Sequence, residues 1–434
     1  MIYHNKRIIT RTVKLTLLCL FLFLLININV HADSLKNEIN IFIDAHPKIT
    51  AARQQLSNAN IDVKVAKDNY MPVLRVSSDI GDQSYSDSAV NIDSTMNNNR
   101  YIVEISQNVF RGFRDRSLQN QAMVKETIAI KKYENTRQEV LLEAINAYLD
   151  VLHYDQVQTV IEKKVELLQQ YSELMNTAKE SGSKTEVDVY EAQLSYQQSL
   201  EQQSDIQGKY LSALGNFESL YGYSAIVESM STPVYDSKLI PSSLDESLEL
   251  AKNQSVLITL AQSNIDQALY EKDTVKSDYW PSLDIVGSAS EENNREGRKG
   301  RTQDNRIYLK IEWRYNLGHQ NFKKVKSASG NIIKERYNYE AVIKDVSKKV
   351  RLAWQKHTSL KARLKIANDT LKIANNVYEA RKDLKLKGKG GSIAIITAKA
   401  KLLDSTIARY NASFESLKSS YALAKEFGSI QQML

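Results

Sequence analysis

Asn69-Tyr70-Met71-Pro72-Val73-Leu74 returns 209 residues later as Asp278-Tyr279-Trp280-Pro281-Ser282-Leu283. From the next strand-like run onward the offset is a constant 206 and holds over about 120 positions. The pairs at this offset include Val103 with Leu309, Ile105 with Ile311, Gly112 with Gly318, Tyr148 with Trp354, Gly182 with Gly388 and Ala192 with Ala398. Compositional bias does not keep a register for so long, so the chain is an internal duplication and should have a pseudo-symmetric fold.

Each copy has the order helix, strand, strand, long helix, glycine-marked turn, helix. In the first copy, helical spacing of apolar residues predicts a helix over Leu35–Asn69, and Pro72 ends it. A strand follows from Leu74, then a polar loop from about Gly81 to Asn99, then a second strand at about Tyr101–Val109. The predicted fold is mainly α with a small β part, built on a duplicated strand-strand-helical-hairpin unit.

The second strand of the second copy alternates strictly between apolar and polar side chains. One face carries Ile307, Leu309, Ile311 and Trp313, and the other carries Tyr308, Lys310, Glu312 and Arg314. A half-buried strand of a sandwich alternates too, but a sandwich needs more strands than the roughly four present here. A sheet this small cannot hide its edges alone, so we expect closure with other subunits. The apolar face would then meet lipid and the polar face a lumen, with Trp313, Tyr101 and Trp280 at the membrane interface.

Very long helices follow each pair of strands. No proline lies between residues 73 and 232 or after residue 281, and apolar residues recur at helical spacing from Gly112 to Gly182 and from Gly318 to Gly388. A helix of this length reaches roughly 100 Å. The turns Ser181-Gly182-Ser183 and Lys387-Gly388-Lys389 then reverse the chain into return helices at about 185–220 and 392–427.

The N-terminus is interpreted as a secretory signal peptide, residues 1–32. Four basic residues precede an apolar run over Leu15–Ile28, and Val30-His31-Ala32 supplies a cleavage site after Ala32. A single membrane anchor is less favoured, because the run is shorter than the roughly 20 residues that span a bilayer. The only cysteine, Cys19, lies in this leader, so the mature chain would contain no thiol and no disulfide.

Charge is divided unevenly between the copies. Residues 33–280 hold 23 basic and 36 acidic side chains, and residues 281–434 hold 31 basic and 15 acidic ones. The small net charge of the mature chain does not indicate a nucleic-acid-binding protein. Two interpretations stay open: the long solvated helices have drifted in composition, or the two copies pack with complementary rims.

Sequence motifs of enzymes are missing. The histidines of the mature chain, His46, His153, His319 and His357, are widely separated, and the sequence contains no H-E-x-x-H, no G-x-S-x-G and no Walker A motif. The glycine-rich stretch from Lys387 to Gly391 follows a helix and lacks the G-K-[ST] ending. We therefore predict that the chain is not an enzyme and that it binds neither a cofactor nor a metal.

The chain resembles the TolC family, the outer-membrane channel components of Gram-negative efflux pumps and type I secretion systems. The resemblance covers essentially the whole mature chain. It is carried by the duplication, the element order, the aromatic-x-Pro-x-Leu strand starts, the glycine tips, and the strand exits Phe110-Arg111-Gly112 and Asn316-Leu317-Gly318. It implies a homotrimer with a 12-stranded β-barrel in outer-membrane lipid, four strands from each subunit, continued into the periplasm by a long α-helical barrel.

The resemblance also implies a passive exit duct for a tripartite export system. A periplasmic adaptor (membrane fusion) protein would open the duct, and an inner-membrane transporter of the ABC or RND type would supply energy indirectly. Type I protein secretion and small-molecule efflux both stay open, with Arg351-Leu352-Ala353-Trp354 leaning slightly toward the secretion branch. The alternative is a soluble periplasmic coiled-coil adaptor or scaffold, which should show barrel segments around one hairpin instead of two equal copies.

Both turns depart from the family pattern. Family tips commonly contain Val-Gly-x and dock the adaptor, so the docking positions here would be Ser181, Gly182, Ser183 and Gly388. Acids that form a constriction in known members fall on Ala394 and Thr397, whereas the first copy has Asp188 and Glu191. The gate candidates are therefore Asp188, Glu191, Lys385, Lys387 and Lys389. Plain solvated acids at a helix N-terminus would explain the two carboxylates equally well.

These observations divide the chain into four parts. Residues 1–32 form the signal peptide, 33–222 the first structural repeat, 223–243 a linker or equatorial segment, and 244–434 the second structural repeat.

Overall fold

The computed structural model describes residues 34–89, 91–235 and 237–434. The predicted signal peptide, residues 1–32, lies outside them. The first copy comprises α2 (Ser34–Ala45), α3 (Pro47–Asp68), β1 (Val73–Asp87), β2 (Ile92–Arg111), α4 (Arg114–Glu180) and α5 (Glu186–Tyr221). The second comprises α6 (Leu244–Gln254), α7 (Val256–Lys276), β3 (Ser282–Asn293), β4 (Arg301–Glu312), α8 (Gln320–Leu386) and α9 (Ser392–Glu426). Short 3₁₀ turns are η1 (Val227–Ser229), η2 (Ser237–Leu239), η3 (Ser277–Tyr279), η4 (Arg295–Gly297) and η5 (Ile430–Met433).

The sequence repeat is also a structural repeat. The long helices α4 and α8 contain 67 residues each and begin 206 residues apart. Their N-caps, Phe113 and His319, share an unusual left-handed backbone, with φ of 65° and 55°. At the other end Gly182 and Gly388 have φ of 73° and 71° and close matching turns. The predicted chain reversals at these two glycines are confirmed, and both glycines adopt the left-handed backbone typical of a helix C-terminus.

The first predicted helix, Leu35–Asn69, is in fact two helices. Pro47 has no backbone N–H to continue the ladder, and it holds His46 in an extended conformation with ψ of 130°. His46 then caps α3, because its Nδ1 accepts the Lys48 N–H at 3.3 Å. The second copy breaks at the matching residue Ser255, which has ψ of 123°, although no proline follows it. The bend therefore belongs to the repeat, and proline reinforces it in one copy only.

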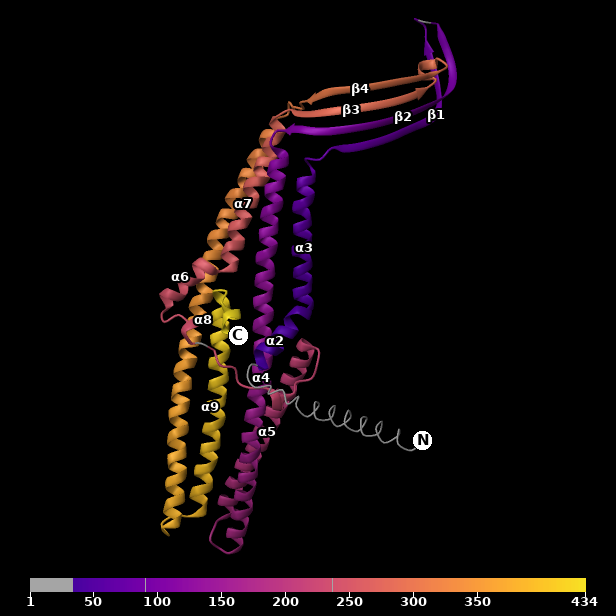
Figure 1. The fold of residues 1–434 in the computed structure, drawn as a ribbon. Helices are drawn as coiled ribbons and strands as arrows, with labels where there is room; N and C mark the ends of the chain where they lie inside the picture. Colours follow the sequence, from indigo (N-terminus) through magenta and orange to yellow (C-terminus); the bar gives the residue numbers. More distant parts are fainter. Residues whose placement is uncertain (1–33, 90, 236) are drawn as a thin grey trace, which may run out of the picture.

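The four strands form one antiparallel sheet in the order β1-β2-β3-β4. The predicted polar loop from Gly81 to Asn99 is wrong, because β1 and β2 stay paired until Asp87 faces Ile92. In an antiparallel ladder the backbone groups satisfy one another whatever the side chains are. Polar cross-strand contacts add to this, such as the Asn98 amide donating to Gln83 Oε1 at 2.8 Å. The sheet is thus a long ribbon that projects from one end of the helices (Figure 1).

The helices form a single curved layer beside and below the sheet (Figure 1). Helix α4 contacts α3 and α7 toward the sheet, and α5 and α9 toward the opposite end. Helix α8 contacts α6, α7 and α9. The layer therefore ends in α3 and α5 on one side and in α8 on the other. No described helix combines the length and the apolar character needed to cross a membrane.

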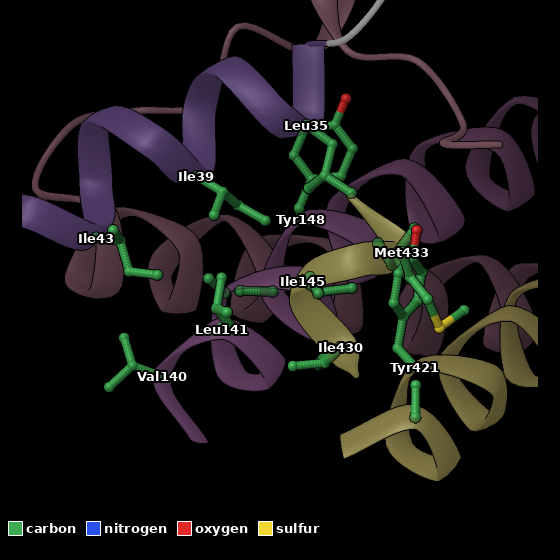
Figure 2. Packing of buried hydrophobic residues seen from close by; sticks show 14 of the residues in the cluster. Leu35, Ile39, Ile43, Val140, Leu141, Ile145, Tyr148, Tyr421, Ile430 and Met433 are labelled. Carbon is green, nitrogen blue, oxygen red and sulfur yellow. The ribbon is translucent and has the colours of Figure 1, made fainter. Parts of the chain in front are cut away.

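The main core lies halfway along the layer, where α2, α4, α9 and η5 meet (Figure 2). Its largest side chains include Tyr148, Phe217 and Tyr421, each fully buried. The segment between the copies closes over this core, because the Tyr148 hydroxyl donates to the Ser231 carbonyl at 3.0 Å. Apolar burial is thus concentrated at mid-length and thins toward both ends of the helices.

Two buried histidines lie between the long helices and α9. His153 Nε2 is 2.6 Å from Asn411 Oδ1, and His357 Nδ1 is 3.3 Å from the Ser420 hydroxyl oxygen. Burial lowers the pKa of both imidazoles below the ordinary value of 6.5. Among the described residues neither ring has a carboxylate as its hydrogen-bond partner, so a proton on either would be poorly compensated.

We expect the protein to lose thermal stability as pH falls from 7 to 5. In the unfolded chain both histidines become protonated near pH 6.5, whereas in the folded chain their lowered pKa delays protonation to lower pH. The unfolded state therefore binds more protons than the folded state between pH 7 and 5. Each fully resisted protonation costs about 1.4 kcal/mol per pH unit. Circular dichroism melting at pH 7, 6 and 5 measures the loss, and H153N/H357N should flatten it. An equal slope in both proteins would contradict this origin.

Candidate functional site

The first candidate surface is the apolar face of the sheet. The strand register places Leu74, Ile105, Gly287 and Ile307 in one row across all four strands, and Leu283 next to Ile311. Ile307 is 87% exposed in the single chain, and Leu309 and Ile311 are exposed as well. A soluble protein rarely leaves a continuous apolar face of this size in water. This face requires another apolar medium or a partner.

The apolar band has aromatic residues at the end nearest the helices. Trp313 follows directly after β4, and its indole Nε1 donates to the Tyr279 carbonyl at 3.3 Å. Trp280 packs edge-to-face against Phe110 and Phe113 with centroids 6.5 Å apart. Tyr101 lies on the same apolar face toward the far end, opposite Ser78 and Glu291. Apolar strands with flanking aromatics are the pattern of membrane-facing sheets.

The opposite face of the sheet is mainly polar and charged, although Val73, Ile102 and Val286 also lie on it. Arg75, Glu104, Ser288 and Arg306 share one row, and Asp284 faces Lys310. Of the residues predicted for this face, Tyr308, Lys310 and Glu312 lie on it within β4, and Arg314 follows just past the strand. Arg314 Nη2 is 3.0 Å from Glu312 Oε1, which extends the charged face toward the helices. The sheet thus separates an apolar side from a charged one.

Both outer strands of the sheet have an open edge. Among the described residues, β1 pairs only with β2 and β4 only with β3. Each outer strand therefore presents unpaired backbone N–H and C=O groups along one side. If the apolar face lies in an apolar medium, these backbone groups need protein partners, because the medium offers no hydrogen bonds.

A second candidate site lies where strands become helices, and sequence reasoning missed it. Gly112 follows directly after β2 with φ of 61°, and a Cβ at this position would collide with the Ser277 carbonyl oxygen and the Trp280 Cβ. Beside this corner a cavity of about 620 Å³ is lined by charged groups from four segments. Its charged lining residues are Arg111, Arg114, Arg314, Lys324, Asp278 and Glu312. The only signal in the sequence was the repeated strand exit, which gives no hint that the two exits converge.

Two acidic side chains near the turn of the first copy form ion pairs with lysines of the same turn. Thr185 and Asp188 form a capping box at the start of α5, and Lys184 Nζ is 3.2 Å from Asp188 Oδ1. The Thr185 backbone N–H, then its hydroxyl, then Lys184 lower the pKa of Asp188 to about 2. Lys179 pairs with Glu186 at 3.1 Å. Asp188 therefore has a local structural role, whereas Glu191 is exposed to solvent.

The turn of the second copy is cationic and exposed. Lys385 Nζ donates to the Ser392 hydroxyl at 3.0 Å, and Lys387 and Lys389 are exposed in the turn. No acid occurs in the sequence between Asp383 and Asp404. The two turns lie at the same end of the layer, and Ile393 of α9 packs against Met175, Val189 and Ala192 of the first hairpin (Figure 1). The docking candidates Ser181, Gly182, Ser183 and Gly388 occupy the two turns themselves.

Other site chemistry is sparse. Within the described ranges, no group of three or more His, Cys, Asp or Glu side chains is arranged to hold a metal ion. The four histidines of the described residues lie far apart in the sequence, and His153 and His357 are packing residues between helices.

Comparison with known proteins gives one family and several similar folds. A family model described as outer membrane efflux protein matches residues 39–223 and again residues 247–429. No curated protein matches the chain in a sequence search. The crystal structure of the outer membrane protein VceC from Vibrio cholerae is similar at 14% identity and a TM-score of 0.75, covering 91% of this chain and 96% of VceC.

Two further solved structures have the same fold. A membrane protein from Pseudomonas aeruginosa is 14% identical with a TM-score of 0.76, covering 91% of this chain and 94% of its own. The CmeC outer membrane channel of Campylobacter jejuni is 14% identical with a TM-score of 0.72, covering 91% and 86%. The predicted architecture of a duplicated, mainly helical chain with a small antiparallel sheet is confirmed.

Proposed function

Because the chain belongs to the outer membrane efflux protein family, we propose that three copies form one channel that serves as a passive exit duct. The protein resides in the outer membrane and extends into the periplasm, as the family does. The soluble-adaptor alternative loses its basis with this membership. The family and the similar folds are channel proteins, which supports the prediction that the chain is no enzyme.

The observation that carries the proposal is a sheet with an exposed apolar face and two open edges. Pairing β4 of one copy with β1 of the next would satisfy both edges, and three copies would close a ring of 12 strands. In that ring the face of Ile307, Leu309, Ile311 and Trp313 would meet lipid. The face of Tyr308, Lys310, Glu312 and Arg314 would line the lumen.

The edges of the helical layer support the same closure. Helix α8 contains 17 basic and 6 acidic residues, whereas α5 contains 1 basic and 6 acidic residues. Both helices also expose apolar side chains at these edges, including Ile366 and Ile373 on α8 and Leu194 and Leu211 on α5. Because α5 and α8 are the two ends of one layer, successive copies would bring opposite charges together. This favours complementary rims over compositional drift as the reason for the uneven charge.

The turns at the far end would be the regulated end of the duct. In our proposal a periplasmic adaptor docks on the turns at Ser181, Gly182, Ser183 and Gly388 and joins the channel to an inner-membrane ABC or RND transporter. The cargo, an exported protein or a small molecule, would be selected by that transporter. The closed state would be held by Lys385, Lys387 and Lys389 against Glu191 of a neighbouring hairpin, since Asp188 already caps α5. Each exposed pair contributes only about 0.2–1 kcal/mol, so the gate would need threefold repetition.

Trimers purified from outer membranes and inserted into planar bilayers should conduct weakly, and K387E/K389E should conduct several-fold better. The reversal removes the attraction and adds repulsion between neighbouring turns, so the closed state loses about 1 kcal/mol or more per protomer. Single-channel recording at low salt measures the change. The matched control K323E/K326E reverses two lysines of α8 near the sheet, where no gate is proposed.

Failure to recover a heat-modifiable trimer from the outer membrane would contradict the channel itself. A trimer whose conductance is the same in the wild type and in K387E/K389E would contradict the gate alone.

A further inference from the structure

The cavity at the sheet–helix corner continues the polar face of the sheet. Arg111, Ser282 and Glu312 form the last row of that face, directly opposite one another in the strand register. Arg114 belongs to the first turn of α4 and Lys324 to the second turn of α8. We call Arg111, Arg114, Arg314 and Lys324 the junction cluster. If the polar face lines the lumen, the junction cluster lies at the level where the sheet passes into the helical wall.

The side chains that line the cavity carry more positive than negative charge. The cavity is lined by the four cations of the junction cluster and by two carboxylates, Asp278 and Glu312. Asp278 is shared, with Arg114 at 3.1 Å and Lys324 at 3.8 Å from its two oxygens. Arg111 Nη1 is 3.9 Å from Oδ1 of the buried Asp115. Even when Asp115 is included, one positive charge per chain is left uncompensated.

The strand rows above the cavity are close to balance and slightly acidic. The basic residues on them are Arg75, Arg100, Arg306 and Lys310, and the acidic ones are Asp79, Asp87, Glu104, Asp284, Glu292 and Asp304. Arg306 forms an ion pair with Asp304, and Lys310 lies opposite Asp284 in the register. The polar face therefore steps from near neutral to cationic at the junction.

The cations also keep free hydrogen-bonding capacity toward the cavity. The side chains of Arg111, Arg114 and Lys324 are 42–48% exposed, and that of Arg314 is 88% exposed. Each guanidinium has five N–H donors in a planar fork, and one carboxylate contact uses only part of them. The remaining donors match the spacing of phosphate or carboxylate oxygens.

We propose that the junction cluster is an anion-binding ring inside the duct, which takes phosphate or carboxylate groups of solutes and cargo passing through it. The inference rests on the proposed trimeric channel, because three copies would place twelve cationic side chains around one lumen. The ring would bind anions weakly at each subunit and would act through repetition around the axis. Its reach would be about 10 Å at 0.1 M salt and only about 3 Å at 1 M, so its effect depends on ionic strength.

Tripolyphosphate is a suitable probe, because it carries several phosphate charges and no recognition elements besides them. Added on the side of the strand hairpins to single trimers in bilayers at 0.1 M KCl, it should reduce the current in a concentration-dependent way. In R114Q/R314Q the half-blocking concentration should rise at least about tenfold, because the ring loses six of its cations. In 1 M KCl the block should disappear in both proteins.

The control R75Q/R100Q removes the same number of positive charges from the balanced rows of the same face. It should change the half-blocking concentration by less than about twofold. R114K/R314K keeps the charge, so it should retain most of the block even if glutamine at these positions weakens the corner. Heat-modifiable trimers and an open-channel current must be present in every variant compared.

Equal block in the wild type and R114Q/R314Q, or equal loss in R114Q/R314Q and R75Q/R100Q, would overturn the inference. Either result would leave the proposed channel intact. Block that follows the anionic lipid content of the bilayer, and not the junction cluster, would also overturn it. Absence of any trimer or conductance would instead contradict the proposed function.

Discussion

Replacing Gly112 by alanine is expected to prevent assembly of the channel in the outer membrane. A Cβ at this position would lie 2.6 Å from the Ser277 carbonyl oxygen and 2.7 Å from the Trp280 Cβ, and φ is already +61°. The left-handed backbone costs about 1–2 kcal/mol with a side chain, and overpacking against fixed backbone adds about 1–3 kcal/mol. The corner cannot relax easily, because Ser277 belongs to η3 and Trp280 packs against Phe110 and Phe113.

Gly318 provides the matched control for this experiment. It occupies the same place in the second repeat, yet its φ is not positive and the nearest obstacle to a Cβ is Asn316 Oδ1, a side-chain atom at 3.0 Å. The yield of heat-modifiable trimer in the outer-membrane fraction should collapse for G112A and stay near the wild-type level for G318A. Normal trimer yield from G112A would show that the corner is softer than its geometry indicates.

Replacing Tyr148 by alanine should destabilise the protein more than any other single truncation in the mid-length core. The ring is fully buried, and it lies beside Leu35 and Ile145 in the cluster where α2, α4 and η5 meet (Figure 2). Removing a large buried aromatic ring costs about 3–5 kcal/mol, because the surrounding side chains refill the space only in part. The Ser231 backbone would also lose both of its hydrogen bonds to the hydroxyl, at 3.0 and 2.9 Å.

Tyr148→Phe separates packing from hydrogen bonding. It keeps the ring and removes only the hydroxyl, so the expected loss is about 1 kcal/mol. Denaturation of the purified protein followed by circular dichroism should order the stabilities as wild type, Y148F, then Y148A, with the large step last. A larger loss in Y148F than in the second step would mean that the link to Ser231, and not the buried ring, holds the core together.

Much of this fold could be predicted because its signals are local and repeated. The proline-free tracts, the helical spacing and the glycine turns gave α4 and α8 to within a few residues of their observed bounds. The β4 alternation also predicted two unlike faces, and the register places apolar residues of all four strands on the face of Ile307, although Val73, Ile102 and Val286 lie on the other. Alternation with period two assigns a side chain to a face whatever the neighbouring strand is.

The errors lie where polar residues take part in regular structure. The segment from Gly81 to Asn99 has few apolar residues, so it resembles a loop, yet pairing with a partner strand makes it a hairpin. The break at His46 was missed because Pro47 fits the first turn of a helix as well as it interrupts one. The hairpin is decided by contacts with the partner strand, whereas at His46 the local sequence is compatible with both a continuous and a broken helix.

The sequence by itself determined the duplication, the lengths of the helices, the two faces of the sheet and the resemblance to one family, because each depends on spacing along the chain. Only the tertiary structure decided how equivalent positions differ. Gly112 is held against the corner of the other copy whereas Gly318 is not, Asp188 is used as a helix cap, and four cations from separate segments meet at one cavity. Such differences arise because the two copies share one sequence pattern but pack against different neighbours, and no spacing along the chain records which neighbour each will meet.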